Sequence, residues 1–170
     1  MKRINLLLLL LVLVCQSVLA ETIRVPEDHA TIQAAIDMAL NGDTIEVRAG
    51  TYVENINFNG KQLLLSGESA ETTIIDGNWQ ERTVELNGQS TIQNFTITRG
   101  DNAENSDRGS GMRITASGAS VRNCIFTDNR GSDGGDHIKI GAANNVIVEN
   151  CQFFNNLSSE PLFADNGSEG

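Results

Sequence analysis

Basic residues are scarce in this sequence, in which 12 Lys and Arg residues stand against 22 Asp and Glu residues over 170 positions. A chain this acidic repels the phosphates of nucleic acids and anionic membrane surfaces, so neither is expected as a partner. The charge can attract cations, including Ca²⁺. The simpler explanation is solubility outside the cell.

The sequence also lacks an apolar run long enough to cross a bilayer. The longest, at 6–14, is shorter than the helix of about 20 residues that a membrane requires. It follows two basic residues and precedes "VLA" at 18–20, the pattern of a secretory signal peptide cleaved after Ala20. We therefore expect a protein that is secreted, periplasmic or held at the cell surface. Its mature chain, 21–170, keeps 10 basic and 22 acidic residues, a net charge of −12.

One nine-residue phrase occurs twice. "VRNCIFTDN" (121–129) returns as "VENCQFFNN" (148–156), with the Asn, Cys, Phe and final Asn in the same places. Short apolar alternations recur at a similar spacing, which indicates strands that bury alternate side chains. These alternations are Ile56 and Phe58, Val84 and Leu86, Met112 and Ile114, and Ile138 and Ile140.

The repeating unit is thus three short strands and three turns in roughly 27 residues. Such a unit fits one rung of an all-β, single-stranded, right-handed parallel β-helix, here of about five coils. Equivalent side chains then stack from coil to coil. Leu64, Ile92, Val121 and Val148 are expected to share one position in the second strand.

Three asparagines align between the second and third strands of successive coils. Asn94, Asn123 and Asn150 are expected to form a ladder inside this bend, because Asn tolerates the left-handed conformation and its amide can bond to the next coil. The final Asn of each repeated phrase is expected to start a turn.

Cys15 leaves with the signal peptide, so Cys124 and Cys151 remain. An even pair in an exported protein permits a disulfide. Their equivalent places in the repeat favour two stacked, buried thiols instead, since parallel side chains in register do not suit the disulfide dihedral angle.

The N-terminal stretch follows a helical period. "TIQAAIDMAL" (31–40) places Ile32, Ile36 and Leu40 on one stripe, with Thr31 as N-cap and Asn41-Gly42 as a stop. This helix is expected to cap the first coil, because an open end exposes strand edges. The expected organisation is a signal peptide (1–20), the β-helix (21–160) and a polar tail (161–170).

These residues carry a family resemblance. The stretch from Thr31 to Glu68, "TIQAAIDMALNGDTIEVRAGTYVENINFNGKQLLLSGE", resembles the opening of pectin-lyase-like right-handed β-helix proteins and is similar to the start of pectin methylesterases. The resemblance implies the fold, and it implies that polysaccharide lies along the outward face of the first strands. It does not imply one activity, because this fold carries lyases, hydrolases, esterases and non-catalytic proteins.

The catalytic phrases of those enzymes are missing. The chain has no Q-D-T-L strand of a methylesterase, and Val148-Glu149-Asn150 stands where a pectate lyase would carry W-I-D-H. The stretch nearest to the paired aspartates of a polygalacturonase, "GGDHIKI" (134–140), has a single Asp.

The outward positions of the first strand hold the substrate-binding candidates Asn57, Glu85, Arg113 and Lys139. Arg113 and Lys139 can bind sugar carboxylates, Arg through a bidentate pair of hydrogen bonds. The simpler interpretation is a solvated face on which Glu85 pairs with Arg113 across adjacent rungs. His137 is a candidate base, but an incidental surface histidine is the simpler interpretation.

Two acidic loops, 99–111 and 128–136, precede first strands of adjacent coils. They could bring together Asp101, Asp107, Asp133 and Asp136, whose oxygens suit Ca²⁺. "GSDGGDHIK" (131–139) also approximates a Ca²⁺-binding nonapeptide, with Ser132 in place of a Gly and no tandem copy. A solvated loop is the simpler interpretation, so no cofactor is assigned and Ca²⁺ stays open.

Three functional hypotheses remain. The first is a secreted, non-catalytic β-helix module that binds a glycan or a cell-surface partner. The second is a divergent or truncated polysaccharide lyase, hydrolase or esterase that uses Arg113, Lys139 and His137. The third is a fragment of a larger β-helix protein. The missing catalytic phrases and the small number of coils favour the first.

Overall fold

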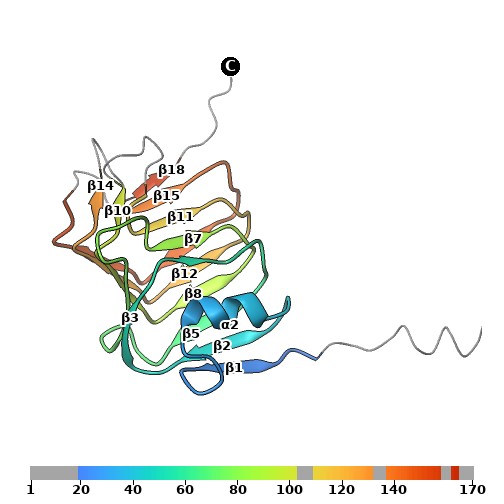
Figure 1. Ribbon diagram of the computed structural model, residues 1–170. Coiled ribbons are helices and arrows are strands. Elements are labelled where there is room, and N and C mark those ends of the chain that lie inside the picture. The colour runs from blue at the N-terminus through green and yellow to red at the C-terminus, as the bar shows by residue number, and fades with distance from the viewer. Residues whose placement is uncertain (1–18, 103–108, 132–136, 158–161, 165–170) are drawn as a thin grey trace, which may run out of the picture.

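A computed structural model of the chain describes residues 19–102, 109–131, 137–157 and 162–164. The predicted signal peptide lies almost wholly outside these residues. Short strands recur along the described chain, and a helix lies near its start (Figure 1). Within the described residues, no helix is both long and apolar enough to span a membrane.

Three parallel sheets are each built from equivalent strands of successive coils, and in the described part of the chain the first strand of sheet A has no counterpart in the other two sheets. Sheet A contains, in spatial order, β1 (Thr22–Val25), β2 (Thr44–Val47), β5 (Leu64–Gly67), β8 (Thr91–Gln93), β12 (Ser120–Arg122) and β16 (Ile147–Glu149). Sheet B contains β3 (Gly50–Val53), β6 (Thr73–Asp76), β9 (Thr96–Thr98), β13 (Ile125–Thr127) and β17 (Gln152–Phe154). Sheet C contains β4 (Ile56–Asn57), β7 (Val84–Leu86), β11 (Met112–Ile114), β15 (Ile138–Ile140) and β18 (Leu162–Ala164).

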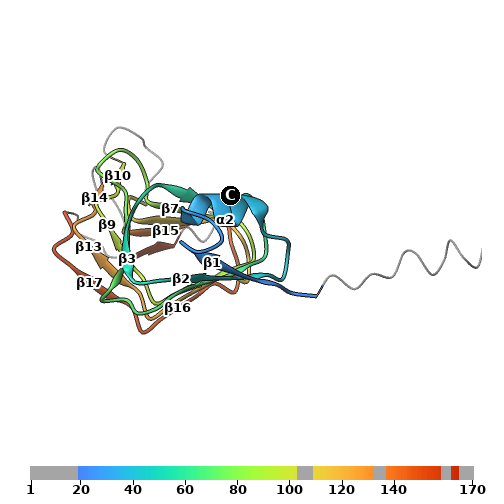
Figure 2. The same cartoon turned by 60° about the horizontal axis from the view of Figure 1, so that its bottom comes forward.

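The chain visits sheets A, B and C in turn and then begins the next coil, which is the predicted parallel β-helix. Over the described ranges, sheet A has six strands, and sheets B and C have five strands each. The sequence predicted about five coils, which corresponds to about five strands in each sheet. The sheets form the sides of the cross-section (Figure 2). The short pair β10 (Asp101–Asn102) and β14 (Arg130–Gly131) projects from the corner between sheets B and C.

The register confirms the apolar stacks that the repeat predicts. Ile56, Val84, Met112 and Ile138 are successive partners in sheet C, and Ile97, Phe126 and Phe153 are partners in sheet B. The prediction for the second strand was wrong by one residue. Leu65, not Leu64, pairs with Ile92 and is buried, and Leu64 lies opposite Thr91.

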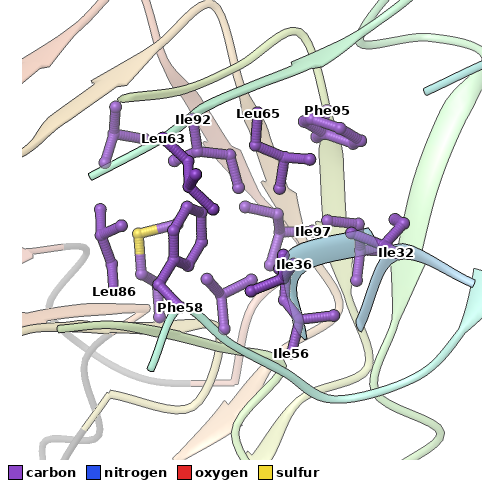
Figure 3. Packing of buried hydrophobic residues seen from close by; sticks show 14 of the residues in the cluster. Ile32, Ile36, Ile56, Phe58, Leu63, Leu65, Leu86, Ile92, Phe95 and Ile97 are labelled. Atoms are coloured by element: carbon purple, nitrogen blue, oxygen red, sulfur yellow. The ribbon is translucent and has the colours of Figure 1, made fainter. Parts of the chain in front are cut away.

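The core between the sheets is apolar and aromatic. Phe58, Phe95 and Phe126 are fully buried, and the rings of Phe126 and Phe153 stack at 5.1 Å between centroids. Figure 3 shows Phe58 beside Leu86, with Ile36 of the helix near Ile56. Each inward side chain therefore touches its equivalents on neighbouring coils, which fixes the register through packing.

The turns bring coil backbones into close contact. A Cβ added at Gly88 would lie 1.8 Å from the carbonyl oxygen of Lys61 in the preceding coil, and one at Gly100 would lie 2.0 Å from that of Ser110. Only glycine permits these approaches.

Helix α2 (Ile32–Met38) is shorter than predicted. Thr31 is its N-cap and accepts a hydrogen bond from the Ala34 amide at 3.2 Å, as expected. Ile32 and Ile36 are buried, but the helix ends at Met38 and Leu40 is 56% exposed. The expected third member of the stripe thus lies beyond the helix.

Coil residues hold both ends of α2 against β4. The Glu54 carboxylate accepts from the amides of Ile32 and Gln33, both at 2.9 Å, where the helix dipole favours an anion. The Gln33 side chain accepts a hydrogen bond from the Asn57 backbone amide and donates one to the Asn57 carbonyl, the two bonds that a neighbouring strand would make. The Lys61 ammonium donates to the carbonyls of Ile36, Asp37 and Ala39 at 2.7–2.8 Å.

The two ends of the stack differ in burial. Ile45 and Val47 of β2 are buried, whereas Val148 and Phe153, at inward positions of β16 and β17, are only partly buried. β18 lies within the segment predicted as a polar tail and pairs with β15. It occupies the end of the stack opposite β1 (Figure 1).

Candidate functional site

Four polar side chains stack on the outward face of sheet C. Asn57 pairs in register with Glu85, Glu85 with Arg113, and Arg113 with Lys139. Successive strands of a sheet lie about 4.8 Å apart, so the four positions form a continuous column, here called the outward stripe. The structure thus brings together all the substrate-binding candidates of the sequence.

Glu85 lies between two arginines at the centre of the stripe. One carboxylate oxygen is 2.5 Å from Nη1 of Arg82, and the other is 3.5 Å from Nη1 of Arg113. The Glu85 side chain is 18% exposed, and Arg82 also donates from Nε to the Gly109 carbonyl at 2.8 Å. The pairing of Glu85 with Arg113 across rungs is therefore present. It fixes the guanidinium groups at the surface of the sheet.

Amide side chains continue the stripe toward the helix. Asn87 donates from Nδ2 to Oδ1 of Asn57 at 2.9 Å, and its own Oδ1 accepts from the Gly60 amide. Asn55 donates to the Arg82 carbonyl at 2.9 Å. These side chains line a groove of about 370 Å³ together with Ile56, Glu81, Arg82 and Glu85. Fixed amides and charges of this kind suit a ligand rich in hydroxyl and carboxylate groups.

The loops between sheets B and C make a wall beside the groove. The Asp101 amide donates to the Glu81 carbonyl at 3.0 Å, and the Arg130 amide donates to the Gly100 carbonyl at 2.9 Å. Hydrogen bonds between backbone groups therefore join the loops of three successive coils. Such a wall holds its side chains more firmly than isolated loops would.

Trp79, the single tryptophan of the chain, lies in the first of these loops and is 39% exposed. Its φ of +59° is unusual for a bulky residue. Two hydrogen bonds stabilise this conformation: the Asn78 backbone amide donates to the Asp76 carboxylate, and the Trp79 backbone amide donates to the Arg99 carbonyl. The Arg130 guanidinium lies 5.4 Å from the indole centroid and pairs with Asp101. This cluster was not predicted from the sequence, although the single Trp in the turn "GNWQ" (77–80) marks its position.

His137 is not on the surface, so the simpler interpretation made from the sequence was wrong. Its side chain is 4% exposed, and its ring centroid lies 6.2 Å from that of Phe153, which packs against the core. Burial lowers the pKa of its imidazole. The structure therefore places His137 with the core, away from the exposed surface where Arg113 and Lys139 would meet a ligand.

The calcium candidates are only partly described. Asp107, Asp133 and Asp136 lie outside the described residues. Asp101 is described, and its carboxylate pairs with Arg130. Among the residues whose structure is described, no three His, Cys, Asp or Glu side chains come together as a metal site would require.

The asparagine ladder follows the bend between sheets A and B. Asn94, Asn123 and Asn150 have φ values of +62°, +51° and +55°, and Asn123 donates to Oδ1 of Asn94 at 3.3 Å. Asn94 donates in turn to the Gly67 carbonyl. Asn123 and Asn150 are exposed, so these amides lie at the outer surface of the bend, and the expectation of a ladder inside the bend was wrong.

A second amide pair occurs where the sequence predicted turn residues. Asn129, the final Asn of the first repeated phrase, is fully buried and donates to the Ile97 carbonyl at 3.0 Å. The equivalent Asn156 accepts from the Asn129 amide at 2.8 Å and donates to the Phe126 carbonyl at 2.8 Å. These inward amides satisfy backbone groups at the corner between sheets B and C. Asn129 and Asn156 therefore form hydrogen bonds between successive coils, in addition to the expected role at the start of a turn.

Comparisons with known proteins agree with this architecture. Residues 63–169 match the family model described as right handed beta helix region. No curated protein sequence matches the chain.

Two solved structures resemble the fold. Pectin methylesterase from carrot aligns with a TM-score of 0.52 at 15% identity, over 78% of this chain and 51% of that one. A pectin methylesterase D178A mutant in complex with hexasaccharide IV aligns with a TM-score of 0.47 at 15% identity, over 82% of this chain and 56% of that one. The chain spans about half the length of these structures. At 15% identity the likeness to the carrot protein shows the fold alone.

Proposed function

The chain belongs to the right-handed β-helix family, and we propose that it is a secreted, non-catalytic member that binds an acidic polysaccharide along the outward face of sheet C. The observation that carries the proposal is the outward stripe, in which Asn57, Glu85, Arg113 and Lys139 follow one another on successive rungs. A column of regularly spaced polar groups matches a polymer whose units repeat along one direction.

The chemistry of the stripe supports an anionic ligand. Arg113 and Lys139 provide cations on adjacent rungs, and a guanidinium group binds a carboxylate in a bidentate geometry. The mature chain carries a net charge of −12, which repels an anionic polymer as a whole. Attraction must therefore be local, so binding depends on these two residues in particular.

The groove and the wall supply the rest of the surface. The groove of about 370 Å³ offers amide donors and acceptors for sugar hydroxyl groups. Trp79 offers a partly exposed indole in the loop that leads to β7, and a backbone hydrogen bond to Arg99 holds its position before a ligand arrives. An aromatic face can pack against the C–H groups on one face of a sugar ring, because the contact removes apolar surface of both from water.

A binding role fits the state of the central carboxylate. Both oxygens of Glu85 are engaged by arginines, so this group orients cations and is poorly placed to transfer a proton to substrate. The name of the carrot protein suggests pectin as the first polymer to test. The enzyme hypothesis predicts turnover of that polymer, and the binding hypothesis does not.

The test measures binding and turnover together. Calorimetric titration with de-esterified pectin is compared with titration by a neutral polysaccharide. We expect binding only to the acidic polymer, and a loss of about tenfold in Arg113→Gln or Lys139→Gln, corresponding to about 1.4 kcal/mol. Arg122→Gln is the matched control, because Arg122 pairs with Glu149 on the outward face of sheet A.

Turnover is followed in the same preparations with methylated and de-esterified pectins, with and without Ca²⁺. Released methanol or an unsaturated product would replace the non-catalytic proposal by an enzymatic one. Equal weakening by Arg113→Gln and Arg122→Gln would show that binding reflects overall charge and would remove the site from sheet C.

A further inference from the structure

Cys124 and Cys151 occupy the same position on successive coils. Their neighbours Ile125 and Gln152 are register partners, and the Gln152 amide donates to the Cys124 carbonyl at 2.9 Å. Adjacent strands lie about 4.8 Å apart. That separation falls within the Cα distance of about 4.4–6.8 Å that a disulfide spans.

The surroundings of the two thiols differ. Cys124 is fully buried, and its sulfur lies 3.2 Å from the Arg122 carbonyl oxygen. Cys151 is partly exposed, and its sulfur lies 3.4 Å from the Glu149 carbonyl oxygen. The partly exposed thiol is therefore the one that an external reagent reaches first.

The sulfur of Cys151 also reaches toward the coil of Cys124. It lies 3.8 Å from the carbonyl oxygen of Val121, a residue of the same coil as Cys124. Both sulfurs point toward the carbonyl two residues earlier, so a disulfide requires one side chain to rotate about χ1. Cys151 has the room to do so, because its coil is only partly buried.

The protonation of the pair agrees with this asymmetry. The hydrogen bond from Cys124 lowers the pKa of Cys151 to about 7. The same bond, together with burial, raises the pKa of Cys124 well above its ordinary value. Since the thiolate is the nucleophile, Cys151 is the member of the pair that is reactive near neutral pH.

We propose that Cys151 is a reactive thiol and Cys124 its resolving partner, which together form a reversible disulfide between β13 and β17. The Cys151 thiolate attacks one sulfur of a low-molecular-weight disulfide, forms a mixed disulfide and releases one thiolate. Cys124 then loses its proton and attacks the sulfur of Cys151, which releases the second thiolate. The protein loses two electrons, and the external disulfide is reduced to two thiols.

The test treats the folded, reduced protein with oxidised glutathione and follows its intact mass. The wild-type chain is expected to lose two hydrogens and to retain no glutathione. Cys124→Ala should retain one glutathione on Cys151, because nothing resolves the mixed disulfide. Cys151→Ala should stay unmodified while folded. A Cys151→Ala chain that reacts as fast as the wild type, or a wild-type chain that keeps its glutathione, would overturn the assignment.

A second experiment tests whether Cys124 lowers the pKa of Cys151 or only packs against it. The rate at which iodoacetamide alkylates Cys151 is measured against pH in the wild type and in Cys124→Ala. The midpoint is expected near pH 7 in the wild type and at a higher pH in the variant, where the donating thiol is gone. Identical midpoints would contradict the proposed pairing. Circular dichroism verifies that both chains are folded.

Discussion

The outward faces of sheets A and C both carry charged side chains, but they hold them differently. On sheet A, Arg24 pairs with Glu46 and Arg122 pairs with Glu149, one to one, and all four side chains are 39–57% exposed. On sheet C, Glu85 serves both Arg82 and Arg113, and these three side chains are only 16–33% exposed. The same strand geometry therefore supports a solvated face and a fixed polar surface.

The difference has a structural origin in the turns. Sheet C is preceded in each coil by a loop from sheet B, and these loops bond to one another through Glu81, Asp101 and Arg130. One of these loops carries the partly exposed Trp79 and also Arg82, which pairs with Glu85. Fixed, partly buried charges are worth more to a ligand than exposed ones, because less ordering is needed on binding. This difference is the reason why we propose sheet C, and not sheet A, as the binding face.

The largest expected difference between the two faces is in the free energy of unfolding after removal of the Glu85 carboxylate, which Arg82 and Arg113 share. Glu85→Ala leaves two partly buried guanidinium groups close together, and we expect the free energy of unfolding to fall by about 2 kcal/mol. Glu149→Ala removes an exposed partner on sheet A and should cost less than about 1 kcal/mol. Urea denaturation of both variants measures the difference. Equal costs would mean that the two faces are energetically alike.

A smaller effect is expected at the wall. Trp79→Gly removes the indole at a backbone position where glycine is unstrained, so the relief of strain and the lost contact with Arg130 should nearly cancel in stability. Binding of the acidic polysaccharide should weaken by about 1 kcal/mol, or roughly fivefold. Calorimetry and thermal melting separate the two quantities. Unchanged affinity would exclude Trp79 from the binding surface.

The smallest effect concerns pH and tests whether His137 belongs to the core behind sheet C or to its surface. Burial lowers the pKa of His137 below its ordinary value of 6.5, so the unfolded chain takes up a proton before the folded one does. Stability should therefore be lost as pH falls from about 6.5 toward the lower pKa of the folded state. His137→Gln should flatten this part of the profile, and polysaccharide affinity should not change. A variant whose affinity fell while its pH profile stayed unchanged would place His137 at the site.

Much of the fold follows from the sequence, because a repeat of about 27 residues and a two-residue period fix which strands stack. The error at Leu64 shows where this information ends. In "QLLLSG", Leu63, Leu64 and Leu65 are all apolar, so the pattern cannot say which of them points inward. In the structure Leu63 and Leu65 are buried, whereas Leu64 between them is only partly buried.

The candidate site was predicted in part for a similar reason. The outward stripe could be found because its four members alternate with apolar residues on strands. Burial of His137 and of Asn129 could not be found, since polar residues in loops carry no period that reports their direction. The cluster of Trp79, Arg130 and Asp101 depends on contacts between loops of different coils, which no local pattern encodes.

Trp79 offers the most direct test of recognition by sheet C, because it is the single tryptophan and lies in a loop beside the stripe. Its fluorescence is recorded during titration with de-esterified pectin. We predict a saturable change in emission that Arg113→Gln and Lys139→Gln shift to about tenfold higher ligand concentration and that Arg122→Gln leaves in place. No change in emission with the acidic polymer, or the same shift in Arg122→Gln, would contradict the account.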